Sequence, residues 1–284
     1  MKRLAPLMCA IALAAAAPVA APVASLGAQA AAYNREAGDT LRYHDVTKMD
    51  GMVHGAAGDA PFTLTREATF AFSFGGGESV TAWFDSLAIE ASGALGGEKS
   101  HSEELLHAPF KLHMEPNGRV QTVRAPELPR NARLIAELPP QLDDFFPRLP
   151  ASGRMSIGAV WTDTATRSES DSAGHHLLIR RISHYRALRD TVVDLQKAVV
   201  ISQHVDVRIT STVPMQTQPY IAALSLTGIE DGIAVFCPIA GRLLSRERTG
   251  ELRGAVTYKG GDAPWVVSQT YHYHRMDVLE REKK

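Results

Sequence analysis

The chain has 284 residues, of which 45% are hydrophobic and 21% charged, and its 30 lysines and arginines nearly balance its 31 aspartates and glutamates. These proportions are those of an ordinary globular protein and exclude collagen-like, coiled-coil and disulfide-scaffold classes. The formal net charge of −1 provides none of the broad positive field that nucleic-acid binding usually requires, so we expect no nucleic-acid partner.

The N-terminus has the layout of a secretory signal peptide. Lys2 and Arg3 form a short positive region, residues 4–17 are uncharged and mostly apolar, and Ala28-Gln29-Ala30 supplies a small-x-small cleavage pattern. We predict that residues 1–30 are removed and that the mature chain is periplasmic or secreted. A retained membrane anchor is the alternative. No later apolar run approaches the roughly 18 residues that a spanning helix needs, so we expect no transmembrane segment in the mature chain.

The first half of the mature chain has a period of two, which is typical of β-strands. In residues 69–74 the side chains of Phe70, Phe72 and Phe74 share one face, and small residues share the other. A second strand follows at residues 80–84. The glycines at positions 75–77 separate the two runs and predict a turn between them.

A short helical segment interrupts the strands. Asn131 can cap a helix on which Leu134, Ile135 and Leu138 form an apolar stripe. The proline pair at 139–140 ends that helix, because proline lacks the backbone donor that a helix interior needs. We interpret the helix and the proline-rich residues after it as a connector between two β halves.

Strands return after the connector. Val205, Val207 and Ile209 alternate with polar residues, and residues 177–182 alternate more weakly. Cys237 ends an apolar run and is the one cysteine left after removal of the signal peptide. It cannot form an intramolecular disulfide, and its apolar neighbours favour a buried thiol over a nucleophile.

These patterns together predict a mainly β protein: an antiparallel curved sheet or open half-barrel, built as one unit or as two related lobes joined by a short helix. The expected divisions are a signal peptide at 1–30, an N-terminal β half at 31–130, a helical proline-rich connector at 131–157 and a C-terminal β half at 158–284.

Motifs for catalysis are absent from the sequence. There is no Gly-x-Ser-x-Gly elbow, no His-Glu-x-x-His helix, and no glycine-rich loop for phosphates or dinucleotides. His272 and His274 would share one face of a strand and could bind a metal together. A third ligand cannot be named, and an exposed polar face is the favoured interpretation. We expect no cofactor and no metal site, and the balance is against an enzyme.

Charged residues near the connector have simpler interpretations. We expect Asp143 and Asp144 to form the polar side of the connector. Arg180 and Arg181 belong to a cationic cluster with two further arginines downstream. That cluster would orient an anionic head group or, as the favoured alternative, form salt bridges on an exposed sheet face.

The order of several segments carries a family resemblance. "APFKLHMEPNGRV" is followed by "DDFFPRLP", "SIGAVWTDT" and "AVFCPIAGRLLS". This order resembles a family of secreted bacterial β proteins known as a domain of unknown function, over residues 40–279. The chain departs from that pattern before Trp161, where Gly158-Ala159-Val160 is more apolar. More loosely, the layout resembles the open half-barrels of periplasmic lipoprotein and lipid carriers. The resemblance implies ligand or lipid handling and transfers no catalytic residue.

Two classes of function follow. The first is an exported, non-enzymatic envelope protein that holds a lipid or another apolar molecule against the curved sheet, with the helix as a lid. The expected ligand-binding side chains are Phe70, Phe72, Phe74, Trp83, Leu134, Ile135 and Leu138. The competing interpretation is that they form an ordinary core. The second class is a structural or interaction protein of the envelope that contacts an unidentified protein through its sheet edges. A metal-dependent hydrolase is a distant third.

Overall fold

The computed structural model describes residues 29–34, 36–56, 58–96, 102–127, 142–170, 174–214, 221–260 and 264–280. The predicted signal peptide, apart from its last two residues, lies outside the described residues. So does the apolar stripe of Leu134, Ile135 and Leu138.

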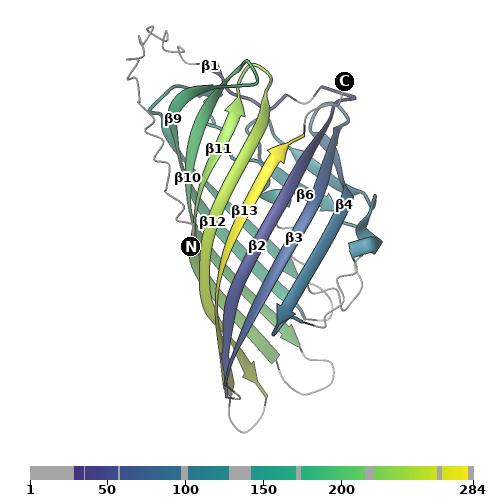
Figure 1. The fold of residues 1–284 in the computed structure, drawn as a ribbon, viewed down its shortest axis with the longest axis vertical. Coiled ribbons are helices and arrows are strands. Elements are labelled where there is room, and N and C mark those ends of the chain that lie inside the picture. The colour runs from purple at the N-terminus through teal and green to yellow at the C-terminus, as the bar shows by residue number, and fades with distance from the viewer. Residues whose placement is uncertain are drawn as a thin grey trace, which may run out of the picture.

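The described residues are mostly β-strands (Figure 1). The elements, in chain order, are β1 (Gln29–Ala30), β2 (Thr40–Gly55), β3 (Gly58–Phe74), β4 (Ser79–Gly93), the 3₁₀ turn η1 (Ser102–Leu105), β5 (Phe110–Met114), β6 (Val120–Arg124), β7 (Arg154–Met155), β8 (Val160–Ser170), β9 (His176–Val193), β10 (Gln196–Pro214), β11 (Ile221–Cys237), β12 (Arg242–Lys259) and β13 (Trp265–Leu279). No helix in these ranges is long and apolar enough to cross a membrane.

Eleven strands form one antiparallel sheet in the order β6-β5-β4-β3-β2-β13-β12-β11-β10-β9-β8. Each strand is next to its neighbour in sequence, except where β2 pairs with β13 and so joins the two halves of the chain. The right-handed twist of such long strands curls the sheet, as Figure 1 shows. Within the described residues β6 and β8 are the two edges and do not pair with each other. The predicted fold class, an open curved antiparallel sheet, is confirmed.

Side chains bridge the two edges at one level of the sheet. Asp143 accepts a hydrogen bond of 2.7 Å from the backbone N–H of Thr122 in β6, and it also pairs with Arg167 of β8. Nearby, the indole N–H of Trp161 donates to the carbonyl of Arg148 at 2.8 Å. The segment from residue 142 to residue 150 therefore lies between the edges and contacts both of them.

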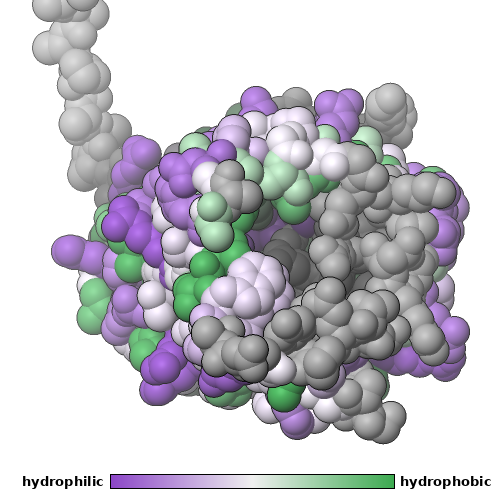
Figure 2. All heavy atoms as spheres, turned by 90° about the horizontal axis from the view of Figure 1, so that it is seen from below, coloured by the Kyte–Doolittle hydropathy of each residue, from purple (hydrophilic) through white to green (hydrophobic). Residues whose placement is uncertain are grey.

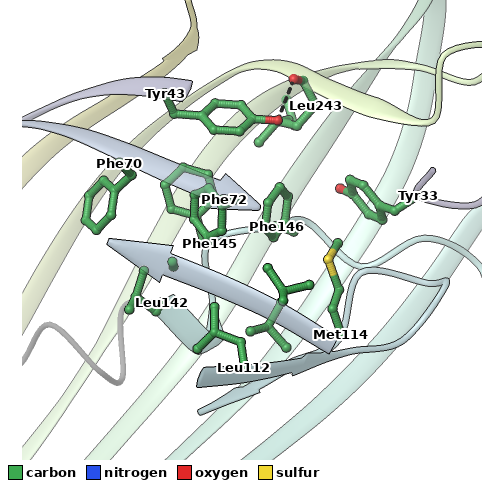
Figure 3. Close-up of a cluster of buried hydrophobic side chains, with 14 of the residues drawn as sticks. Tyr33, Tyr43, Phe70, Phe72, Leu112, Met114, Leu142, Phe145, Phe146 and Leu243 are labelled. Carbon is green, nitrogen blue, oxygen red and sulfur yellow. Dashed lines mark hydrogen bonds between the residues drawn. The ribbon is translucent and has the colours of Figure 1, made fainter. Parts of the chain in front are cut away.

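An aromatic core fills the concave face at the end of the sheet where β2 begins (Figure 3). Phe145 and Phe146, from the segment between the edges, pack against Phe72 of β3 with ring centroids 4.8 and 5.1 Å apart. Tyr43 lies beside them and its hydroxyl donates to the carbonyl of Leu243 at 3.0 Å. This end of the molecule is closed by packed rings. Cys237 is buried, as expected from its apolar neighbours.

Candidate ligand-binding site

The concave face changes in character along the strands. Directly paired residues of neighbouring strands point to the same face of the sheet. Every second row of paired residues therefore faces the concave side, and each such row forms one level of the concave surface. Beyond the aromatic core the rows carry buried charged side chains, which we call the charged belt. Beyond the belt, toward the β2–β3 and β12–β13 turns, the rows carry apolar side chains, which we call the apolar hollow.

The apolar hollow draws on most of the long strands. Its described side chains include Met49, Val53, Phe62, Leu64, Ile179, Val207, Ile209, Leu224, Leu226, Leu252, Val256, Tyr271 and Tyr273. Phe62, Val207, Leu226 and Leu252 are buried, and the other side chains of the hollow are partly buried. Seen from this end, the molecule is hollowed at its centre, with hydrophobic side chains beside the opening (Figure 2). Within the described residues, the concave face is therefore filled by packed rings at one end and hollowed at the other.

Two glycines shape the wall of the hollow. The ring of Phe62 lies over Gly51, where a Cβ atom would be 2.4 Å from the ring carbon Cζ. The ring of Tyr273 lies over Gly250 in the same way, with a Cβ atom 2.5 Å from its Cε1. Any side chain at these two positions would push the rings off the sheet, because real Cβ contacts are never so short. The glycines thus let two large aromatic side chains lie flat against the wall.

The belt contains two carboxylates that face each other. Asp45 and Asp277 are directly paired across β2 and β13, and both are fully buried. Asp45 pairs with Arg66 at 2.8 Å and with Arg275 at 2.6 Å, and Asp277 pairs with Arg275 at 2.8 Å. Burial opposes ionisation of Asp45, but the charges of Arg275 and Arg66 outweigh it and lower its pKa. Burial, together with the charge of Asp45, raises the pKa of Asp277 to about 6.

This raised pKa predicts a pH dependence of stability. Asp277 contributes stability that is full below the ordinary carboxyl pKa of about 3.9 and is lost as the pH rises through about 6. Asp277→Asn cannot lose a proton, so the loss between pH 4 and pH 6 should be absent from the variant. Urea unfolding at a series of pH values measures it. Asp50→Asn, an exposed position on β2, should keep the wild-type profile; the same loss in Asp277→Asn would contradict the assignment.

The second half of the belt surrounds Asp144. Its carboxylate lies 3.1 Å from Arg181 and 3.4 Å from Arg246, and it forms an ion pair with Arg248. Glu230 pairs with Arg181 and, at 3.4 Å, with Arg248. Burial opposes ionisation of Asp144, but the surrounding arginines, Arg181 first, outweigh it and hold the pKa of Asp144 well below its usual range. Strands β9, β11 and β12 are thereby linked through the segment between the sheet edges.

A cleft opens beside this half of the belt, between β6 and β8. Its volume is about 530 Å³. Its charged lining residues are Arg119, Asp143, Asp144, Arg148, Arg167, Glu169 and Arg181. Ile179, the next residue of β9 that shares the concave face with Arg181, also lines the cleft. The cleft therefore leads from the sheet edges to the boundary between charged and apolar levels.

The structure places the predicted ligand-binding phenylalanines in the aromatic core. Phe70, Phe72 and Phe74 are buried, and the ring centroids of Phe70 and Phe84 are 4.3 Å apart. Trp83 pairs in register with Ala71, so it lies on the opposite face of the sheet from these rings, and its indole N–H donates to Asp85 at 2.7 Å. The three phenylalanines thus come together, and Trp83 does not join them. Contact between the phenylalanines and a ligand stays a prediction.

Two interpretations of charged residues are wrong. Asp144 does not belong to a polar side of the connector, because it is buried and three arginines hold it on the concave face of the sheet. Arg180 and Arg181 do not share a cluster, because adjacent strand residues point to opposite faces. Arg180 is exposed on the outer face, whereas Arg181 points into the belt.

His272 and His274 share the outer face. His272 lies 3.6 Å from Glu251, and His274 lies 2.8 Å from Glu247. Both imidazoles are about half exposed. Over the ranges that the structure describes, no group of three histidines, cysteines or carboxylates is arranged to hold a metal ion.

Comparisons with known proteins establish the fold alone. No family model matches the sequence, and no curated protein matches it. The structure is similar to lipovitellin, solved in a study of its lipid–protein interactions, with a TM-score of 0.52 and 11% identity over 87% of this chain. The match spans 26% of the lipovitellin chain. A putative outer membrane lipoprotein-sorting domain from Vibrio parahaemolyticus aligns with a TM-score of 0.15 and 10% identity, over 85% of this chain and 87% of that one. The class defined here is an open, curved antiparallel sheet with an apolar concave end.

Proposed function

We propose that this protein is exported to the cell envelope, where it binds a lipid in the apolar hollow without acting as an enzyme. The observation that carries the proposal is the hollow itself: a concave, largely apolar surface that the described residues form at one end of the sheet (Figure 2). Ligand pockets are typically concave and mostly apolar. A core that only stabilised the fold would be filled, as it is at the aromatic end.

Burial of an acyl chain against such a surface would favour binding. Each methylene buried from water contributes about 0.8 kcal/mol, so ten methylenes of an acyl chain contribute about 8 kcal/mol before the cost of association is subtracted. Lipovitellin, whose structure was studied for its interactions with lipids, has a similar sheet. That likeness supports the proposal at the level of architecture.

A protein-interaction role through the sheet edges is the alternative. β8 is an unpaired edge of 11 residues within the described part of the chain. It carries Asp163, Arg167 and Glu169, and charged side chains on an edge discourage pairing with another strand. The apolar hollow is therefore the stronger candidate.

A carboxylate placed in the hollow should weaken lipid binding. Leu224 and Ile229 both lie on β11, but Leu224 points into the hollow whereas Ile229 is 48% exposed on the outer face. Leu224→Asp should lower the affinity for a neutral apolar probe such as Nile red at least about tenfold, equivalent to about 1.4 kcal/mol. The reason is that the bound probe would remove water from the new carboxylate.

The matched variant Ile229→Asp should bind Nile red as the wild type does. Native mass spectrometry of wild-type protein purified without detergent should also detect a lipid adduct. A bare chain that also fails to bind Nile red would overturn the proposal and leave the edge-interaction alternative.

A further inference from the structure

The half of the belt around Asp144 holds more positive than negative charge. Three buried or nearly buried guanidiniums, those of Arg181, Arg246 and Arg248, share two carboxylates, Asp144 and Glu230. No third carboxylate among the described residues pairs with any of the three within 4 Å. Uncompensated charge is costly away from water, so this part of the belt favours an additional anion.

Hydrogen-bond donors in the same group lack acceptors. The Nε–H groups of Arg181, Arg246 and Arg248 are buried and have no hydrogen-bond partner among the described residues. Buried donors are nearly always paired in folded proteins. Burial and the neighbouring charge of Arg248 lower the pKa of Arg246 to about 10, whereas Asp144 and Glu230 outweigh burial at Arg181 and raise its pKa.

The surplus charge lies where the cleft meets the apolar hollow. Arg181 lines the cleft and is directly paired with Val207 of β10, a side chain of the hollow. The next inward residue along β9 toward the open end is Ile179. A molecule with a charged group beside Arg181 would thus have an apolar wall immediately below that group.

We infer that the ligand is an anionic amphiphile, with a carboxylate or phosphate head group beside Arg181 in the cleft and a hydrocarbon chain in the apolar hollow. The inference rests on the proposed function and specifies its ligand class. Guanidinium is suited to the role because it presents several N–H donors in a plane that matches carboxylate and phosphate oxygens. The cleft between β6 and β8 gives the head group access to solvent.

A comparison of head groups on one chain length tests the inference. Dodecanoate, dodecyl phosphate, dodecanol and inorganic phosphate are titrated against the mature wild-type protein with Nile red bound. Both anionic amphiphiles should displace the probe about tenfold to a hundredfold more tightly than dodecanol, as expected for one charge-assisted hydrogen-bonded pair. Inorganic phosphate alone should not displace it.

Variants on one strand locate the effect. Arg181→Gln should remove the preference for the anionic amphiphiles while leaving dodecanol binding unchanged, and Arg180→Gln, one residue away on the outer face, should keep the preference. Circular dichroism establishes that each variant is folded. If Arg181→Gln does not fold, Arg167→Gln at the mouth of the cleft replaces it and should reduce the preference.

The outcomes separate this inference from the proposed function. Equal binding of dodecanoate and dodecanol by the wild type would overturn the anionic head group and leave lipid binding intact. Failure of every amphiphile to displace the probe, or failure of the probe to bind, would overturn both. If folded Arg181→Gln keeps the full preference for anionic amphiphiles, the head group does not lie beside Arg181. If inorganic phosphate competes as strongly as dodecyl phosphate, the site binds an anion without a lipid, which overturns the inference.

Discussion

Replacing Asp144 by asparagine is expected to lower the free energy of unfolding by about 3–5 kcal/mol, the loss typical of removing one partner from a buried ion pair. The neutral amide would leave Arg181, Arg246 and Arg248 with the single carboxylate of Glu230. The hydrogen bonds that Arg246 donates to the backbone carbonyls of Asp144 and Phe145 would remain, so the expected loss comes from the carboxylate.

Urea unfolding followed by circular dichroism measures this loss. Asp231→Asn is the control, since Asp231 forms an exposed pair with His204 on the outer face and such pairs contribute about 0–1 kcal/mol. A loss below about 1 kcal/mol in Asp144→Asn would contradict the view that this carboxylate holds the belt together.

The sign of the pH dependence adds a second check on Asp144. Its pKa is lowered in the folded state, so it contributes stability that is present above the ordinary carboxyl pKa of about 3.9 and is lost as the pH falls further. The wild type should therefore lose stability steeply in acid, and Asp144→Asn should lose less over the same range. Asp277 acts in the opposite direction between pH 4 and pH 6, so its asparagine variant separates the two effects.

The strands and the fold class follow from the sequence because a period of two records which face of a strand is buried. The alternation at Phe70, Phe72 and Phe74 correctly places three rings on the concave face. The same rule fails at the charged belt. On β13 the apolar residues Met276 and Val278 are 39% and 37% exposed, whereas Arg275 and Asp277, which alternate with them, are buried. Polarity alone assigns these four side chains to the wrong faces.

The belt could not be derived from the sequence because its charges compensate one another only through the register of distant strands. Asp144 and Arg248 are 104 residues apart along the chain, and neither neighbourhood identifies the other as its partner. Burial of a charge is tolerated only where an opposite charge pairs with it, so a buried charge cannot be predicted before the strand pairing is known. The signal that was available is weaker: Arg246 and Arg248, like Arg275 and Asp277, occupy alternate positions that share one face of a strand.

The sequence also cannot distinguish a packed apolar face from an open one. Both ends of β3 carry inward phenylalanines: Phe72 faces Phe145 and Phe146, whereas Phe62 lies over Gly51 and approaches Tyr271 with ring centroids 6.4 Å apart. The difference depends on whether another segment fills the space, which is a property of the tertiary structure. Ligand contact at Phe70, Phe72 and Phe74 therefore needs a direct test.

Alanine variants at the two ends of β3 should separate the core from the site. Phe72→Ala is expected to lower the free energy of unfolding by about 3–5 kcal/mol, because it leaves a cavity among packed rings, while the folded fraction keeps its affinity for Nile red. Phe62→Ala should weaken Nile red binding, because Phe62 lies in the wall of the hollow. Urea unfolding and probe titration of both variants measure the two quantities. Loss of probe affinity in folded Phe72→Ala, with none in Phe62→Ala, would instead place the ligand against the aromatic core and move the site to the other end of the sheet.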